Sequence, residues 1–229
     1  MKIGFIGLDV PEGKVKYEDE RLNALAEKIS PKKVSPFFVE FVSSDLVHCD
    51  ALVCLKEKIL DLLIPDMDKL EKQIEKTQDE KGKELIKKCL AQLENETPLC
   101  NVEFTEEELV IMTELAPLSL KPTVVLEKAT DTNEMIKMVL EKAAIVLFYT
   151  TAKGELKSWP VKKGSDIVTC ASKIHTDLAK GFIRAEVVNY SDFVTVPNMH
   201  EAQEKGIVKI VGKDYSIKDG DIIEIRFNV

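Results

Sequence analysis

The residues best suited to chemistry follow the first apolar run of the chain. Residues 7–15 read GLDVPEGKV, close to the G-x-x-x-x-G-K-[ST] loop that binds phosphates through backbone N–H groups, a lysine and a Mg²⁺-binding hydroxyl. One extra residue separates the glycines, Pro11 removes a donor, Glu12 adds negative charge, and Val15 replaces the hydroxyl. Open α/β sheets bind ligands at the carboxyl ends of their strands. The pattern therefore leaves room only for residual nucleotide binding, at Gly7, Gly13 and Lys14.

A second candidate group is basic and lies in the last third of the chain. Cations contact phosphates and aromatic rings stack on bases, and here Trp159 and Phe182 are interleaved with the cations. The alternative is a set of solvated lysines balanced by nearby carboxylates. His175 stands two residues before Asp177, but no nucleophile is evident nearby, so local hydrogen bonding is favoured over acid–base catalysis. The residues expected to contact RNA or a partner are Lys162, Lys163, Lys173, His175, Lys180 and Arg184.

Other kinds of site are disfavoured by composition. The five cysteines contain no C-x-x-C pair and the three histidines are scattered, so we expect no metal, no disulfide framework and no cofactor. The formal net charge is −8, and nonspecific nucleic-acid binding depends on phosphate neutralisation, so only a local basic patch would serve. No apolar run reaches the ~18–20 residues of a membrane span, and the N-terminus lacks the features of a signal peptide.

Short apolar runs alternate with helical patterns in the first two thirds of the chain, which predicts an open, mostly parallel α/β sheet. Two helices are expected, over Asp19–Ile29 and Thr132–Lys142, and Thr105–Glu108 matches a capping box that starts another. Residues 66–96 predict a hairpin of two helices with Gly82 between them. The expected strands are Lys2–Gly7, Phe37–Val42, Ala51–Leu55, Pro122–Glu127 and Ala144–Tyr149.

The composition and the pattern of apolar residues change near residue 153. Glycines become frequent, and three short β runs surround one helix near Cys170–Ala179, which predicts a small α+β domain. The expected domains are residues 1–151 and 152–229. The β runs cover Phe182–Asn189, Ile207–Val211 and Asp221–Phe227.

Several motifs in this region carry a resemblance. Residues 174–177 (IHTD), 180–187 (KGFIRAEV), 212–215 (GKDY) and 218–223 (KDGDII) resemble the C-terminal TGS domain of YchF-type GTPases, relatives of Obg. Upstream, RLNALAE at 21–27 and PKKV at 31–34 look like landmarks of the same family, whose helical insertion would correspond to residues 66–96. The resemblance implies a shortened P-loop GTPase-like α/β domain followed by a TGS-like β-grasp domain.

Two further elements of the family's nucleotide site are missing besides the phosphate loop. After the Val39–Val42 strand the family carries Asp-x-x-Gly, whereas this chain reads Ser43-Ser-Asp-Leu46, with Asp45 at most a displaced relic. The base-recognition Asn-x-x-Asp/Glu is replaced by residues 127–131, EKATD. The loss of all three nucleotide-binding elements together indicates that the nucleotide-dependent activity of the family was abandoned.

The connection over Ser43–Asp50 has eight residues, too few for a parallel crossover that contains a covering helix. One sheet face would then be partly bare. We expect it to be covered by the Asp19–Ile29 helix, by the C-terminal domain or by a second copy of the chain, as a homodimer.

The sequence therefore favours a non-catalytic, cytoplasmic binding or adaptor protein without membrane contact. It would touch RNA or a translation-related, ribosome-associated partner through its TGS-like domain. The alternatives are a divergent protein that still binds ATP or GTP through Gly7–Lys14, and an oligomeric scaffold.

Overall fold

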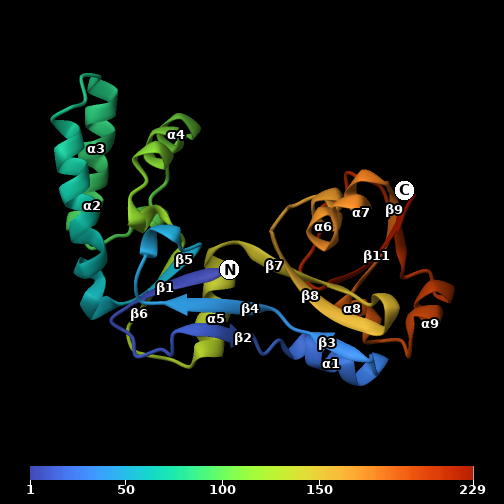
Figure 1. The fold of residues 1–229 in the computed structure, drawn as a ribbon. Helices are drawn as coiled ribbons and strands as arrows, with labels where there is room; N and C mark the ends of the chain where they lie inside the picture. Colours follow the sequence, from blue (N-terminus) through green and yellow to red (C-terminus); the bar gives the residue numbers. More distant parts are fainter. Residues whose placement is uncertain (229) are drawn as a thin grey trace. The chain divides into compact units, whose positions relative to one another are not determined.

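The computed structural model describes residues 1–228, with only the backbone at Lys153 (Figure 1). The chain folds into two compact units. The first contains residues 1–15 and 39–143, and the second contains residues 16–38 and the chain from residue 144 onward. The second unit therefore includes an N-terminal segment that the sequence assigned to the first domain. The expected boundary at residues 151/152 also lies later than the observed one.

The first unit is built on a five-stranded sheet, as expected for an α/β domain. The order is β2-β4-β1-β5-β6, and β1 pairs in parallel with β4 and β5, as β5 does with β6. The alternation of strands and helices had predicted this parallel arrangement. The strands are β1 (Lys2–Ile6), β2 (Gly13–Lys16), β4 (Phe38–Val42), β5 (Ala51–Leu55) and β6 (Thr123–Leu126).

The eight-residue crossover from β4 to β5 lies directly on β1. It contains only a 3₁₀ turn, η1 (Leu46–His48), so the expectation of no covering α-helix is confirmed. A Cβ added at Gly4 would lie 2.6 Å from Leu46 Cδ2 and 2.7 Å from Leu52 Cδ2. The missing side chain at Gly4 is what lets so short a connection pack on the strand.

Neither face of this sheet is bare. Ile3, Val39 and Phe41 are all at most 1% exposed, and α5 (Thr132–Lys142) packs on β5 and β6. The helix α1 (Glu20–Ile29) packs instead on a strand of the second unit, β8 (Glu155–Lys162), so the expectation that it covers this sheet is wrong. A bare sheet therefore gives no reason for a homodimer.

The helical hairpin is present, with different bounds from those expected. It consists of α2 (Ile59–Ile74) and α3 (Glu80–Glu94), so it begins seven residues before Asp66. Gly82 does not form the turn but is buried in the first turn of α3, where its N–H donates to the Asp79 cap. Asp66 is buried as well, and its carboxylate accepts the N–H groups of Leu118 and Ser119, each at 2.7 Å.

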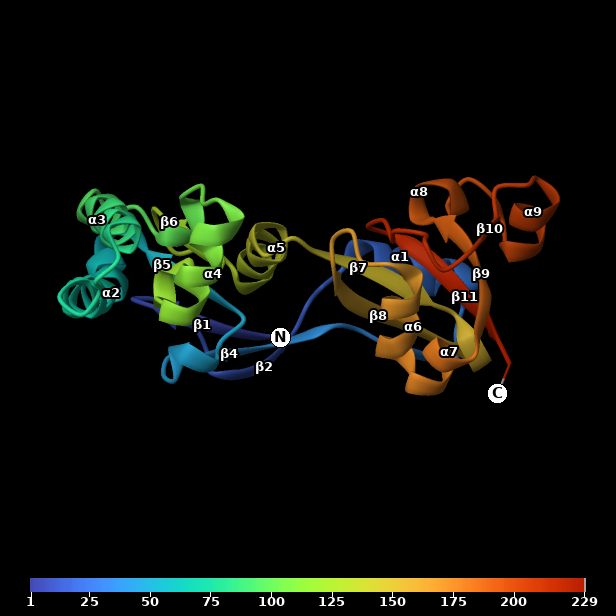
Figure 2. The same cartoon turned by 90° about the horizontal axis from the view of Figure 1, so that it is seen from above.

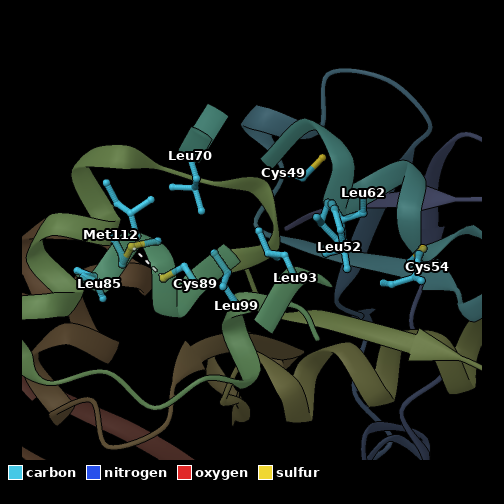
Figure 3. Close-up of a cluster of buried hydrophobic side chains, with 13 residues drawn as sticks. Cys49, Leu52, Cys54, Leu62, Leu70, Leu85, Cys89, Leu93, Leu99 and Met112 are labelled. Atoms are coloured by element: carbon cyan, nitrogen blue, oxygen red, sulfur yellow. Dashed lines mark hydrogen bonds between the residues drawn. The ribbon is translucent and has the colours of Figure 1, made fainter. Parts of the chain in front are cut away.

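The hairpin shares one apolar core with the sheet and with α4 (Glu106–Leu115), whose expected capping box is confirmed. Figure 3 shows Leu70, Leu85, Cys89 and Met112 at one end of this core, with Cys89 Sγ 3.6 Å from Met112 Sδ. The apolar side chains of the two helices therefore pack within the protein's own core. The core also contains Cys49, Leu52, Cys54, Ile59, Leu62, Leu63, Ile86, Leu93 and Leu99.

The second unit contains a six-stranded mixed sheet of order β10-β9-β11-β7-β8-β3. The strand β7 follows α5 and pairs with β8 and β11, which is why it belongs to this unit and not to the first. Its strands, besides β8, are β3 (Lys33–Ser35), β7 (Ile145–Thr150), β9 (Phe182–Asn189), β10 (Lys209–Val211) and β11 (Asp221–Phe227).

Helices lie on both faces of this sheet (Figure 2). The helix expected near Cys170–Ala179 is two short helices, α6 (Ile167–Ile174) and α7 (Thr176–Lys180), and they share a core with Phe148, Ala185 and Val187. The remaining helices are α8 (Tyr190–Phe193) and α9 (Met199–Glu204). Among residues 1–228, no helix is both long and apolar enough to span a bilayer.

Candidate functional site

The first candidate site is the carboxyl edge of the parallel sheet, where the phosphate-loop-like residues lie. The chain leaves β1 at Gly7, which has a positive φ of 73°, and enters β2 at Gly13. Lys14 is an exposed residue of β2. A phosphate loop places its N–H groups at the N-terminus of the following helix. Here a strand follows the loop in the chain, and the helix N-terminus beside Gly7 is that of α2, whose cap residue is Lys58.

The space over Gly7 is occupied. A Cβ added at Gly7 would lie 2.5 Å from Lys58 Cγ, so the stem of Lys58 rests on the backbone at this turn. A phosphate needs close access to such a glycine backbone. In this structure the Lys58 side chain occupies the position from which a phosphate would approach the Gly7 backbone.

A carboxylate occupies the next strand end. Glu12 accepts hydrogen bonds from the backbone N–H of Ser43, at 2.9 Å, and from the Ser43 hydroxyl. The hydroxyl bond, followed by the backbone bond, lowers the pKa of Glu12 below its usual value. The N–H and hydroxyl groups of Ser43, the residue after β4, thus donate to a carboxylate of the chain itself.

The third strand end is closed by an ion pair. Lys56, directly after β5, contacts Glu127, directly after β6, at 2.7 Å. The hydrogen bond and charge of Glu127 raise the pKa of Lys56. The adjacent hollow of about 380 Å³ is lined by Lys56, Glu57, Ile59, Leu60, Glu96 and Glu127. Three carboxylates against one lysine make this hollow repulsive to a triphosphate.

The predicted basic group of the second unit divides into separate places. Lys162 and Lys163 lie at the end of β8, just before α6, whereas Lys173 lies in the last turn of α6 and Lys180 ends α7. Lys163, Lys173 and Lys180 are exposed, and no ion pair engages them within the described chain. These lysines lie on or next to α6 and α7, and a shared binding surface for them stays a prediction.

The other members of the predicted group do not join these lysines. His175 caps α7, with Nδ1 accepting the N–H of Asp177 at 3.2 Å, which fits the structural interpretation. Arg184 faces away from α6, since its neighbour Ala185 packs in the core beneath that helix. Phe182 is buried, and half-buried Trp159 stacks on Phe148 with its indole N–H donated to Thr150. Neither ring forms the expected stacking platform.

A polar network missed by sequence reasoning joins α1 to the C-terminal strands. The buried carboxylate of Asp19 caps α1 and accepts the Tyr149 hydroxyl at 2.5 Å. Arg21 donates to both carboxylate oxygens of Asp219, at 2.6 and 3.3 Å, and its guanidinium lies 5.8 Å from the Tyr149 ring centre. Burial and the neighbouring Asp19 charge raise the pKa of Tyr149. The RLNALAE and KDGD motifs thus hold this unit together.

Asp221, the last residue of the KDGD motif, holds a neighbouring loop in place. Buried Asp221 accepts hydrogen bonds from Tyr215, the Lys218 N–H and Asn189, each at 2.9 Å. Burial, followed by this contact with Asp221, raises the pKa of Tyr215. A loop rich in charged residues is the only sequence signal of this arrangement, and it does not identify the partners.

The thiols provide a direct test of these cores. Cys54, Cys89 and Cys170 are buried, which raises their pKa values to about 11, about 11 and about 12. Thiolates, not thiols, react with iodoacetamide. We expect the native protein near pH 8 to be alkylated first at half-buried Cys100, as read by peptide mass spectrometry. Cys100→Ser should remove this fast phase, and equally fast labelling of Cys89 or Cys170 would contradict the packing.

Comparison with known proteins gives consistent similarities. Residues 145–228 match the family described as YchF-GTPase_C, protein of unknown function (DUF933). The chain is 25% identical to the ribosome-binding ATPase YchF of Bacillus subtilis, with 98% of this chain and 91% of that protein covered. The Mycoplasma genitalium protein of the same name is 36% identical, over 42% of this chain and 26% of that one.

The fold is also shared with a solved structure. The YchF GTPase of Schizosaccharomyces pombe superposes with a TM-score of 0.78 at 18% identity, covering 96% of this chain and 88% of that one. The family match of the C-terminal unit and the similarity over nearly the whole chain support a relationship to the YchF-type GTPases.

Proposed function

We propose that this chain is a cytoplasmic, ribosome-associated binding protein that works without holding a nucleoside triphosphate. Its similar relatives are called ribosome-binding ATPases, and this supports the ribosome as partner. In this proposal the C-terminal unit is a TGS-like domain that contacts RNA, and the first unit is a shortened GTPase-like domain that serves as a scaffold.

One observation carries the proposal: the carboxyl edge of the parallel sheet is occupied by the chain's own groups. Lys58 covers Gly7, Glu12 takes the donors of Ser43, and Lys56 pairs with Glu127. A triphosphate would have to displace all three while facing the acidic hollow.

The difference in length between this chain and its relative also supports the proposed loss of triphosphate binding. The alignment with the Bacillus subtilis protein extends over 333 positions, whereas this chain has 229 residues. The relative thus contains stretches that have no counterpart here. In this proposal the chain is shortened between β1 and α1, and a strand, β2, stands in the place of the helix that a phosphate loop requires.

The rival function is residual nucleotide binding at Gly7, Gly13 and Lys14. The word ATPase in the relatives' names favours it. The geometry of these residues does not, because β2 supplies no helix N-terminus and Lys14 extends from an edge strand.

The ribosome contact is tested by co-sedimentation with purified ribosomes. Lys163, Lys173 and Lys180 would neutralise about three phosphates, and the affinity should fall about 20- to 40-fold between 50 and 200 mM salt. Changing all three to glutamate should abolish this binding without added nucleotide. Trp159 fluorescence then checks that the second unit is still folded.

A matched control separates the surface from net charge. Lys72, Lys76 and Lys87 are exposed residues of the hairpin region in the first unit. Their triple change to glutamate alters the total charge equally and should leave ribosome binding within about threefold. Equal loss in both variants, or no binding by the unmodified chain at 50 mM salt, would overturn the proposed surface.

A further inference from the structure

A β-bulge exposes a charged and apolar face on the second unit. The pairing of β9 with β11 shifts after Arg226, which lies opposite Arg184, so that Phe227 lies opposite Phe182. Phe182 and Ala185 both pack in the core, and the two residues between them turn outward together. We define the Arg184 face as Ile183, Arg184, Glu186, Ile210, Glu224 and Arg226.

The charges on the Arg184 face are unequally paired. Arg226 contacts Glu186 at 3.2 Å and Glu224 at 3.0 Å, so this trio has one surplus negative charge. Arg184 lies directly across from Arg226, and no carboxylate contacts it within the described chain. Like charges directly opposite on neighbouring strands are unfavourable. The face therefore presents one unmatched cation beside one unmatched anionic cluster.

Large apolar side chains lie on either side of these charges. Ile183 is 59% exposed and Ile210 is 66% exposed. Ile210 extends from the edge strand β10 opposite Glu186. Helices α6 and α7 share the core on the other side of these strands, and α9 borders the Arg184 face, where Gln203 donates to Glu186 at 3.1 Å. Exposed isoleucines beside unmatched charges are typical of a protein contact.

The arrangement favours a second copy of this chain over a nucleic acid. Glu186 and Glu224 would repel a polyanion, and the face carries no aromatic ring for stacking. A two-fold contact requires a surface that complements itself. Rotation by 180° can bring Arg184 of one copy against the exposed Glu224 carboxylate of the other, and the reverse. We infer that the Arg184 face forms a symmetric homodimer. This inference is independent of the proposed ribosome contact.

Sedimentation equilibrium over a concentration series tests the inference. The wild-type chain should approach twice its mass of 25.7 kDa as concentration rises. Arg184→Glu should raise the dimer dissociation constant at least about tenfold, since it places like charges in both symmetric contacts. Glu224→Arg should do the same for the same reason.

Mixing the two variants gives the decisive result. In a mixed dimer the two reversed charges meet in one contact and the native pair meets in the other, so the equimolar mixture should regain the wild-type dissociation constant. Ile183→Ser should weaken the dimer without adding a charge, and Lys173→Glu, on the α6 face, should leave it unchanged. A wild-type mass of one chain up to about 100 μM, or no recovery on mixing folded variants, would overturn the inference.

Discussion

Replacement of Asp19 by alanine is expected to lower the free energy of unfolding of the second unit by about 2–4 kcal/mol. The carboxylate is buried, caps α1 through the Arg21 N–H at 3.1 Å, and accepts the Tyr149 hydroxyl at 2.5 Å. Its removal would cost the helix cap and leave a buried hydroxyl without its acceptor. The chain's single tryptophan, Trp159, lies in β8 of this unit, so its fluorescence during urea denaturation measures the effect.

Two variants sharpen this measurement. Glu20→Ala removes a neighbouring exposed carboxylate outside the network and should change stability by no more than about 0.5 kcal/mol. Tyr149→Phe removes only the hydroxyl and should cost about 1–3 kcal/mol. A loss for Asp19→Ala equal to that for Glu20→Ala would show that the network does not hold α1 on the sheet.

The raised pKa of Tyr149 adds a pH dependence with a defined sign. Burial and the Asp19 charge raise the pKa in the folded protein, so the unfolded chain releases this proton first, near its ordinary value of about 10. The stability contributed by the tyrosine is therefore complete below about pH 10 and is lost as pH rises above it. Tyr149→Phe should lack this decline.

Much of the first unit could be predicted from the sequence because its signals are local. The limits of α5 and β5 are those that the apolar periodicity predicted, and the capping box at Thr105 starts α4. The unit boundary could not be predicted, because it depends on pairing between distant segments. The strand β7 reads like another βα-unit strand, yet it pairs with β8 and β11, and the paired residues of β3 and β8 are 122 positions apart.

The sequence indicated what is absent from the candidate site but not what replaces it. The extra residue, Pro11 and Val15 signalled a defective phosphate loop, and Val15 lies in the strand β2, where a phosphate loop would continue into a helix. The contact between Glu12 and Ser43 joins positions 31 residues apart, and the pair Lys56–Glu127 joins positions 71 apart. Charged residues are common in such loops, so spacing alone cannot identify these partners. The same limit applies to the bond between Asp19 and Tyr149, 130 residues apart.

The proposed absence of triphosphate binding is the prediction with the largest expected effect. Phosphate loops gain their affinity from N–H groups at a helix N-terminus and from a lysine and a hydroxyl, and the turn from Gly7 to Gly13 offers no such helix. We expect ATP and GTP to bind with dissociation constants weaker than about 1 mM, which corresponds to less than about 4 kcal/mol of binding free energy. Glu12→Ala should not restore binding, because freeing the donors of Ser43 does not create a helix.

Isothermal titration calorimetry of the full chain with ATP and GTP, each with and without Mg²⁺, tests the central claim most directly. The account predicts no saturable heat with either nucleotide in either condition, for the wild-type chain and for Glu12→Ala alike. Micromolar binding that strengthens with Mg²⁺ and is lost in Lys14→Ala would contradict it.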